Sequence, residues 1–195
     1  MKVKITFTEP ILGTWPADPE VASKFIASKA PDAATIEDEI AATSVEEVVE
    51  KSMTIFPRGD QGPILYDYQV KGFFKDACGM LARVKGTESS KIKAYKKVID
   101  GLIFPAPRCI PIEINGDVGN CQRPLRAQTA QGERVSLANS EEIPAGSSIA
   151  FDVELLDPSH EKLVIEWLDY GRLRGLGQWR NSGKGRFTYE LLPEG

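Results

Sequence analysis

Residues 174–187 read RGLGQWRNSGKGRF and hold glycines in the pattern G-x-G-x5-G-x-G, with four cations and no acidic residue. Glycine permits positive φ angles and close approach of the backbone to a ligand. An amphipathic stretch precedes the glycines and an alternating stretch follows them, which predicts a helix–loop–strand. Dinucleotide-binding loops and P-loops need the reverse order, a strand before and a helix after. The loop therefore either binds an anion through its amides and cations, or only caps the helix and turns the chain.

Hydrophobic periodicity predicts the other elements. Residues 2–8 alternate, with Val3, Ile5 and Phe7 on one face of a strand. Three helices are predicted at 70–83, 89–99 and 159–176, and four more strands at 109–114, 134–139, 147–156 and 185–192. Without insertions the order is β-α-β-β-α-β. This order predicts an α+β chain with a ferredoxin-like (RRM-like) antiparallel sheet and helices on one face.

The remaining segments are predicted to be insertions and loops of a single domain, residues 1–195. Residues 19–53 are predicted to be an inserted acidic helical lobe. Residues 56–69 contain Gly59, Gly62 and Pro63, which favour a loop. Residues 115–133 are predicted to be a long polar loop that carries Arg123 and Arg126.

Charge and composition narrow the possible partners. The net charge is −4, yet residues 51–110 hold 11 cations and 5 acids, so a basic surface is compatible with an acidic chain. The longest apolar runs are shorter than the ~20 residues of a membrane span, and the N-terminus does not resemble a signal peptide. The three cysteines form no C-x-x-C pair. We therefore expect a cytoplasmic protein without membrane attachment, metal or cofactor.

The glycine-rich stretch, in its helix–loop–strand context, resembles the C-terminal glycine-rich motif of the RAMP superfamily of CRISPR-associated proteins. Three further stretches resemble that family in the same order: GPILYDYQVKGFFKDACGMLAR, ERVSLANSEEIPAGSSIAFDVELL and WLDYGRLRGLGQW. The resemblance covers the N-terminal strand and residues 60–192, and leaves the acidic segment unmatched. It departs from the family at residues 70–73, Val-Lys-Gly-Phe, where the family has a turn richer in Gly and Ser.

The resemblance implies a non-catalytic RNA-binding protein, similar to the backbone subunits that grip guide-RNA phosphates and assemble side by side along the RNA. The implied partners are guide-type RNA, CRISPR effector subunits or further copies of the chain. The residues implied at the RNA are Lys71, Lys75, Gly175, Gly177, Arg180, Gly183, Lys184, Gly185 and Arg186. Independently of the family, Arg123 and Arg126 and the lysines at 91, 93, 96 and 97 are candidates, and Trp179 offers a face for base stacking.

Two other functions are compatible with the same fold. The first is a mobile-element protein that inhibits a CRISPR complex by imitating or capping a subunit, with the acidic residues 32–50 mimicking phosphate. The second is an endoribonuclease. His160, the single histidine, lies at the predicted start of a helix without a second acid–base group, and Asp60 and Asp18 lie in turns. No catalytic residue is therefore assigned, and Cys78 is expected to be a buried small residue.

Overall fold

β1, Lys2–Phe7, is the second strand from one edge of the main sheet in the computed structural model, which describes residues 1–17, 53–129 and 132–193. Its neighbours are β12, Phe187–Leu192, and β11, Ser148–Leu155, and both run antiparallel to it. Val3, Ile5 and Phe7 are buried, as the alternation predicted, because every second side chain of a strand points to the same face.

Four more strands extend the sheet beyond β11. β7, Ile103–Ala106, and β8, Cys109–Glu113, both pair antiparallel with β11. β6, Gly62–Tyr66, pairs with β8, and β5, Arg58–Gly59, forms a hairpin with β6. The order β12-β1-β11-β7/β8 is the antiparallel ferredoxin-like order, which confirms the predicted fold class.

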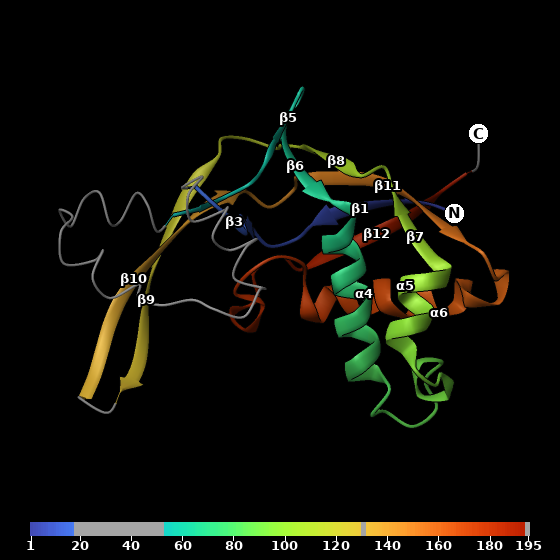
Figure 1. Cartoon of the computed structure of the whole chain (residues 1–195). Coiled ribbons are helices and arrows are strands. Elements are labelled where there is room, and N and C mark those ends of the chain that lie inside the picture. The colour runs from blue at the N-terminus through green and yellow to red at the C-terminus, as the bar shows by residue number, and fades with distance from the viewer. Residues whose placement is uncertain (18–52, 130–131, 194–195) are drawn as a thin grey trace, which may run out of the picture. The chain divides into compact units, whose positions relative to one another are not determined.

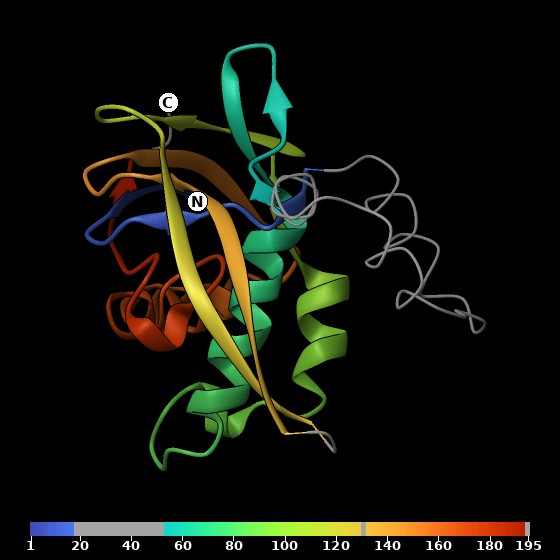
Figure 2. The same ribbon diagram turned by 90° about the vertical axis from the view of Figure 1, so that its left-hand side faces the viewer.

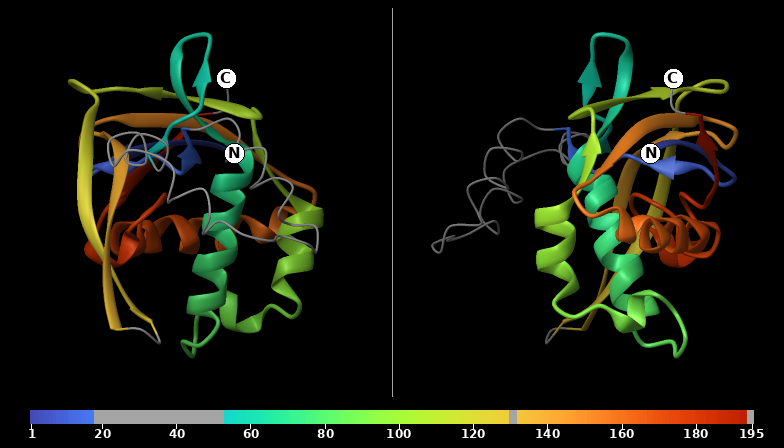
Figure 3. Two further views of the ribbon diagram at one scale, coloured as in Figure 1. Left: turned by 60° about the vertical axis from the view of Figure 1, so that its left-hand side comes forward. Right: turned by 90° about the vertical axis from the view of Figure 1, so that its right-hand side faces the viewer.

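Three helices cover one face of this sheet, as Figures 1 and 3 show: α4, Asp67–Leu81; α5, Tyr95–Leu102; and α6, Glu161–Arg174. Single 3-10 turns lie at Ser89–Lys91 (η1), Pro158–His160 (η2) and Arg180–Ser182 (η3). None of the described helices is both long and apolar enough to cross a membrane.

The core between helices and sheet is aromatic. Phe74 of α4 and Trp167 of α6 pack with ring centroids 5.4 Å apart, and Phe73 meets Phe187 of β12 edge-on at 5.3 Å. Trp167 is fully buried, and its indole nitrogen donates a hydrogen bond to Ser89 Oγ at 2.9 Å. Burying a Phe side chain contributes about 1.5–3 kcal/mol, so α4, α6 and β12 hold one another in place.

The predicted loop at 56–69 is wrong, because β5, β6 and the start of α4 occupy it. β6 runs straight into α4, and the Tyr66 backbone amide donates to Gln69 Oε1 at 2.7 Å in a capping box. The turn that the family has at 70–73 is absent here, since these four residues lie within α4.

A second group of strands contains a long two-stranded ribbon, β9, Gly119–Thr129, and β10, Gly132–Ile143 (Figure 2). β10 also pairs with β2, Ile11–Leu12, and β4, Thr54–Ile55, and β4 pairs with β3, Trp15–Pro16. The predicted polar loop at 115–133 is therefore wrong. Pro124 lies within β9, which pairs with β10 alone among the described strands, and an edge strand tolerates proline.

A single domain is predicted from the sequence, and within it the chain divides into two compact units. The first comprises Met1–Ile11, Pro57–Val118 and Ile143–Gly195 and contains the main sheet and its helices. The second comprises Leu12–Phe56 and Gly119–Glu142 and contains the ribbon. The predicted acidic lobe at 19–53 lies outside the described residues, apart from Met53.

Candidate nucleic-acid interface

Backbone hydrogen bonds close the glycine-rich loop at its two ends, a region that we call the neck (Gly175, Leu176 and Gly185). α6 ends at Arg174, and the Gly175 amide donates to the Gly171 carbonyl at 3.0 Å. The Leu176 amide donates to the Gly185 carbonyl at 2.9 Å, and the Gly185 amide donates to the Pro10 carbonyl at 2.8 Å. The neck therefore ties the end of α6 to the chain before β12 and to the segment after β1.

The neck has no room for side chains at its glycines. Both have positive φ angles, 77° at Gly175 and 71° at Gly185. A Cβ at Gly185 would lie 1.8 Å from the Leu176 carbonyl oxygen, and one at Gly175 would lie 2.6 Å from the Lys184 carbonyl oxygen. Glycine is needed at both positions because two backbone segments touch there.

Residues 177–183 connect the two sides of the neck, and we call this segment the rim. Gly177 and Gly183 have φ angles of 86° and 92°, and Trp179 adopts the left-handed conformation with φ 51°. A left-handed tryptophan is uncommon, and here the Ser182 hydroxyl donates to its carbonyl at 2.8 Å. The Trp179 side chain is 42% exposed. The rim thus presents an aromatic ring on a strained backbone, a feature that clusters at functional sites.

Asp76 of α4 accepts hydrogen bonds from two arginines of this region. Arg174 Nε and Arg180 Nη1 each donate to Asp76 Oδ2 at 2.8 Å, and Arg174 Nη2 donates to Oδ1 at 3.4 Å. Arg174 Nη1 also donates to Asn181 Oδ1 at 3.0 Å. Partial burial raises the pKa of Asp76. The hydrogen bonds and charges of Arg174 and Arg180 lower this pKa by more, so that it lies below its usual value. Asp76 is therefore ionised and holds both guanidinium groups.

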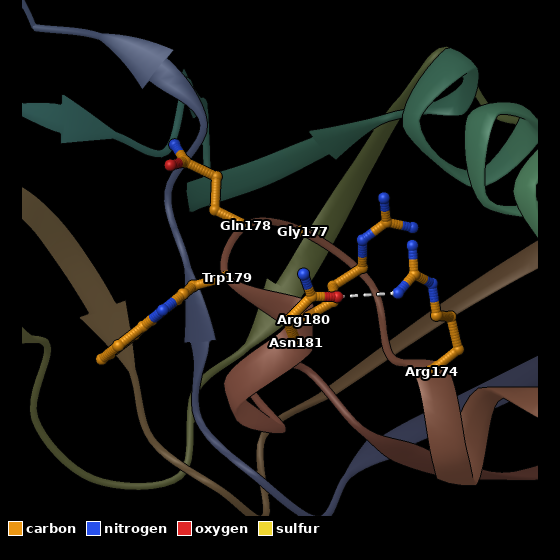
Figure 4. A pocket seen from close by; sticks show the side chains of 6 residues that line it. All are labelled: Arg174, Gly177, Gln178, Trp179, Arg180 and Asn181. Carbon is orange, nitrogen blue, oxygen red and sulfur yellow. Dashed lines mark hydrogen bonds between the residues drawn. The ribbon is translucent and has the colours of Figure 1, made fainter. Parts of the chain in front are cut away.

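The two guanidinium groups border an open hollow of about 290 Å³, lined by Arg174, Gly177, Gln178, Trp179, Arg180 and Asn181. Figure 4 shows the two arginines reaching to the same side, while Trp179 points away from them. Two guanidinium groups against one carboxylate leave one positive charge, and the Gln178 and Asn181 side chains add amide groups to the lining. Such a hollow is suited to an anion with polar substituents.

The remaining predicted cations of the loop lie next to the neck. Arg186 is exposed, and its Nε donates to the Leu173 carbonyl at 3.2 Å, across the end of α6. Lys184 is partly exposed. Arg180, Lys184 and Arg186 therefore all remain candidates for contact with an anion, and Asp76, which sequence reasoning missed, joins them as a partner.

Lys71 and Lys75 contact α5 and β7 rather than the loop. Lys75 Nζ lies 2.5 Å from Asp100 Oδ1, and Lys71 Nζ donates to the Asp100 carbonyl at 3.4 Å. Lys71 Nζ also sits 4.4 Å from the centroid of the Phe104 ring. The structure therefore does not bring these two lysines together with the cations of the glycine-rich loop.

The ribbon arginines differ from the expectation of an exposed polar loop. Arg123 of β9 is only 7% exposed, and its Nη1 donates to Ser140 Oγ of β10 at 3.2 Å. This burial argues against a phosphate contact, because the guanidinium is not presented to solvent. Arg126 pairs with Val135 in the β9–β10 ladder, and its side chain lies outside the described residues.

The residues considered for catalysis are dispersed. His160 ends η2, and its Nε2 lies 4.0 Å from Asp157 Oδ2. Asp60 lies in the turn between β5 and β6, and Asp18 falls outside the described residues. Cys78 is buried, which raises the pKa of its thiol. Within the described part of the chain, no group of three or more His, Cys, Asp or Glu side chains is placed to hold a metal ion.

Comparisons with known proteins find likeness in structure only. Neither a protein family nor a curated protein matches the sequence. A chain in the structure titled "Cryo-EM structure of the Type III-B Cmr-beta bound to cognate target RNA" is 12% identical with a TM-score of 0.50, over 98% of this chain and 58% of that chain. A chain of a "Type IV-B CRISPR Complex" is 13% identical with a TM-score of 0.45, over 100% of this chain and 94% of that one. This chain therefore shares the fold of the first and spans less than two thirds of its length.

Proposed function

We propose that the chain is a non-catalytic RNA-binding protein whose glycine-rich loop contacts the phosphates of a guide-type RNA. The observation that carries the proposal is the convergence of Arg174 and Arg180 on one hollow, with Asp76 as their shared carboxylate. Guanidinium groups bind phosphates through paired N–H donors, and these bonds are stronger than those between neutral groups.

The loop also has positive charge and an exposed aromatic ring, two features by which proteins bind single-stranded RNA. Residues 174–187 contain no acid, so Arg186 and Lys184 extend the positive charge along the neck. The exposed Trp179 offers a face on which an unpaired base stacks, a contact that contributes about 1–3 kcal/mol per base. Phosphate contacts from these cations and a base stacked on Trp179 together favour a single strand over a duplex.

The outer face of the sheet is a poorer candidate. RRM domains bind RNA through aromatic side chains on the sheet surface. The outward positions of β1, β11 and β12 carry no aromatic residue, and three carboxylates, Asp152, Glu154 and Glu190, are exposed there beside Lys2 and Lys4. Carboxylates on this face repel a polyanion, which supports the loop as the RNA site.

The proposed partners beyond RNA are subunits of a CRISPR effector or further copies of this chain. The RAMP resemblance supports them, as does the fold shared with a chain of an RNA-bound Cmr-beta structure. The inhibitor hypothesis depends on residues 32–50, which lie outside the described residues. It predicts capture of effector proteins without RNA in a pull-down.

The test is Arg180→Ala, Lys184→Ala and Arg186→Ala combined, with binding to fluorescently labelled single-stranded RNA measured at several salt concentrations. Losing up to three phosphate contacts lowers the slope of log K against log salt by about 2, because each contact to a single strand contributes about 0.7. We expect affinity to fall at least about tenfold at 0.1 M salt.

The matched control is Arg83→Ala, Lys85→Ala and Lys162→Ala, three exposed cations after α4 and in the first turn of α6, whose removal changes the net charge equally. We expect this variant to bind RNA more tightly than the loop variant. Equal losses of RNA affinity in both variants would mean that binding depends on overall charge and not on the loop. Unchanged binding by the loop variant would refute the proposed site.

A further inference from the structure

Asp76 presents a contradiction if the loop binds a polyanion. Its carboxylate lies within hydrogen-bonding distance of both arginines that border the hollow. On charge alone it repels a phosphate placed there and competes for the same donors. The side chains of Asp76, Arg174 and Arg180 are 21%, 24% and 28% exposed, so this ion cluster is more enclosed than ordinary surface pairs.

The contradiction resolves if Asp76 acts on the arginines rather than on the ligand. We propose that Asp76 is a positioning residue that orients Arg174 and Arg180 toward the hollow, so that its carboxylate strengthens RNA binding despite its charge. This inference rests on the proposed function of the loop.

The hydrogen-bond geometry shows how the orientation arises. Arg174 has its Nε, Nη1 and Nη2 atoms all engaged, by Asp76 and Asn181, so its guanidinium plane is fixed. Arg180 donates through Nη1 to Asp76, and among the described residues no other acceptor for its guanidinium appears. Arg180 thus keeps most of its five N–H donors for a ligand, while one bond holds the group in place.

Orientation matters because a free arginine side chain has many rotamers. Ordering such a side chain on binding costs conformational entropy, and a partner that orders it beforehand removes that cost. Asp76 is supplied by α4, whose neighbours Phe73, Phe74 and Ala77 are buried, so the carboxylate is fixed to the core. The arginines are thereby attached to a helix that packs on the aromatic core.

The experiment compares Asp76→Ala with Asp76→Asn. If Asp76 only adds negative charge, both variants bind labelled single-stranded RNA more tightly than the wild type. If it positions the arginines, Asp76→Ala binds about five- to tenfold more weakly, since a phosphate contact is lost. Asp76→Asn keeps one oxygen where Oδ2 accepts both bonds, so we expect it to bind no more tightly than the wild type and at most about threefold more weakly.

A charge-matched control is Asp100→Ala. Asp100 is an exposed carboxylate of α5 that pairs with Lys75, so its removal changes net charge equally without touching the loop. We expect this variant to bind RNA as well as, or slightly better than, the wild type. The salt slope adds a second measure, because Asp76→Ala is expected to lower it by about 0.7 per lost contact, whereas Asp100→Ala is not.

The outcomes separate this inference from the proposed function. Tighter RNA binding by Asp76→Ala, together with weaker binding by the triple loop variant, would overturn the positioning role and leave the loop as the RNA site. Unchanged binding by the triple loop variant would overturn both. If Asp76→Ala does not fold by circular dichroism, the folded Asp76→Asn decides, because on charge alone it must gain affinity.

Discussion

Gly185 and Gly183 stand two residues apart in the same loop, and both have positive φ angles, 71° and 92°. Their surroundings differ. A Cβ at Gly185 would lie 1.8 Å from a backbone oxygen, whereas at Gly183 the nearest atom would be 3.5 Å away, in the flexible side chain of Arg186. Gly185, like Gly175, therefore serves packing, whereas Gly183 serves only the turn of the chain, although the pattern G-x-G-x5-G-x-G writes them alike.

The largest effect is expected from Gly185→Ala at the neck. The substitution combines a left-handed alanine with a clash against the Leu176 carbonyl, and neither backbone segment can move without breaking the bond from Leu176 to Gly185. We expect the free energy of unfolding to fall by about 3 kcal/mol or more. Urea unfolding measures it, and a loss below about 1 kcal/mol would show that the neck adapts.

A smaller effect is expected from Gly183→Ala at the rim. Only the cost of a left-handed alanine applies, about 1–2 kcal/mol, because the added methyl group finds ordinary contact distances. The same urea titration gives the comparison with Gly185→Ala. A loss equal to that of Gly185→Ala would contradict the distinction between Gly183 and Gly185.

Features set by local pattern could be predicted from the sequence, whereas those set by distant residues could not. β1, α6 and β12 follow from local periodicity, and the glycines with their helix–loop–strand context mark the loop. Local periodicity misses β6 because Gly62 and Pro63 favour a turn, while its pairing with β8 is set by residues far along the chain. Which glycines are packed depends likewise on Leu176 and Pro10, and the motif does not encode that.

Charge partners were the least predictable part of the site. Asp76 is separated from Arg174 by 98 residues and from Arg180 by 104, so no local pattern joins them. Arg123 was expected in an exposed loop because its neighbours are polar, yet the pairing of β9 with β10 buries it. In both cases the fold decides which arginines face solvent, and composition alone misleads.

The smallest expected effect is a dependence of stability on pH, which distinguishes the charge contacts of Asp76 from the backbone packing of the neck. The folded-state pKa of Asp76 lies below its ordinary value of 3.8, so its carboxylate stabilises the fold above pH 3.8, and this stabilisation is lost as pH falls through the folded-state pKa. Asp76→Asn lacks this contribution. The difference in urea midpoint between wild type and Asp76→Asn should therefore be constant near pH 6 and shrink at pH values below about 4. Gly185→Ala acts through backbone packing, so its difference from the wild type should persist over the same range. A gap for Asp76→Asn that does not narrow in acid would mean that Arg174 and Arg180 are held by contacts other than the Asp76 charge.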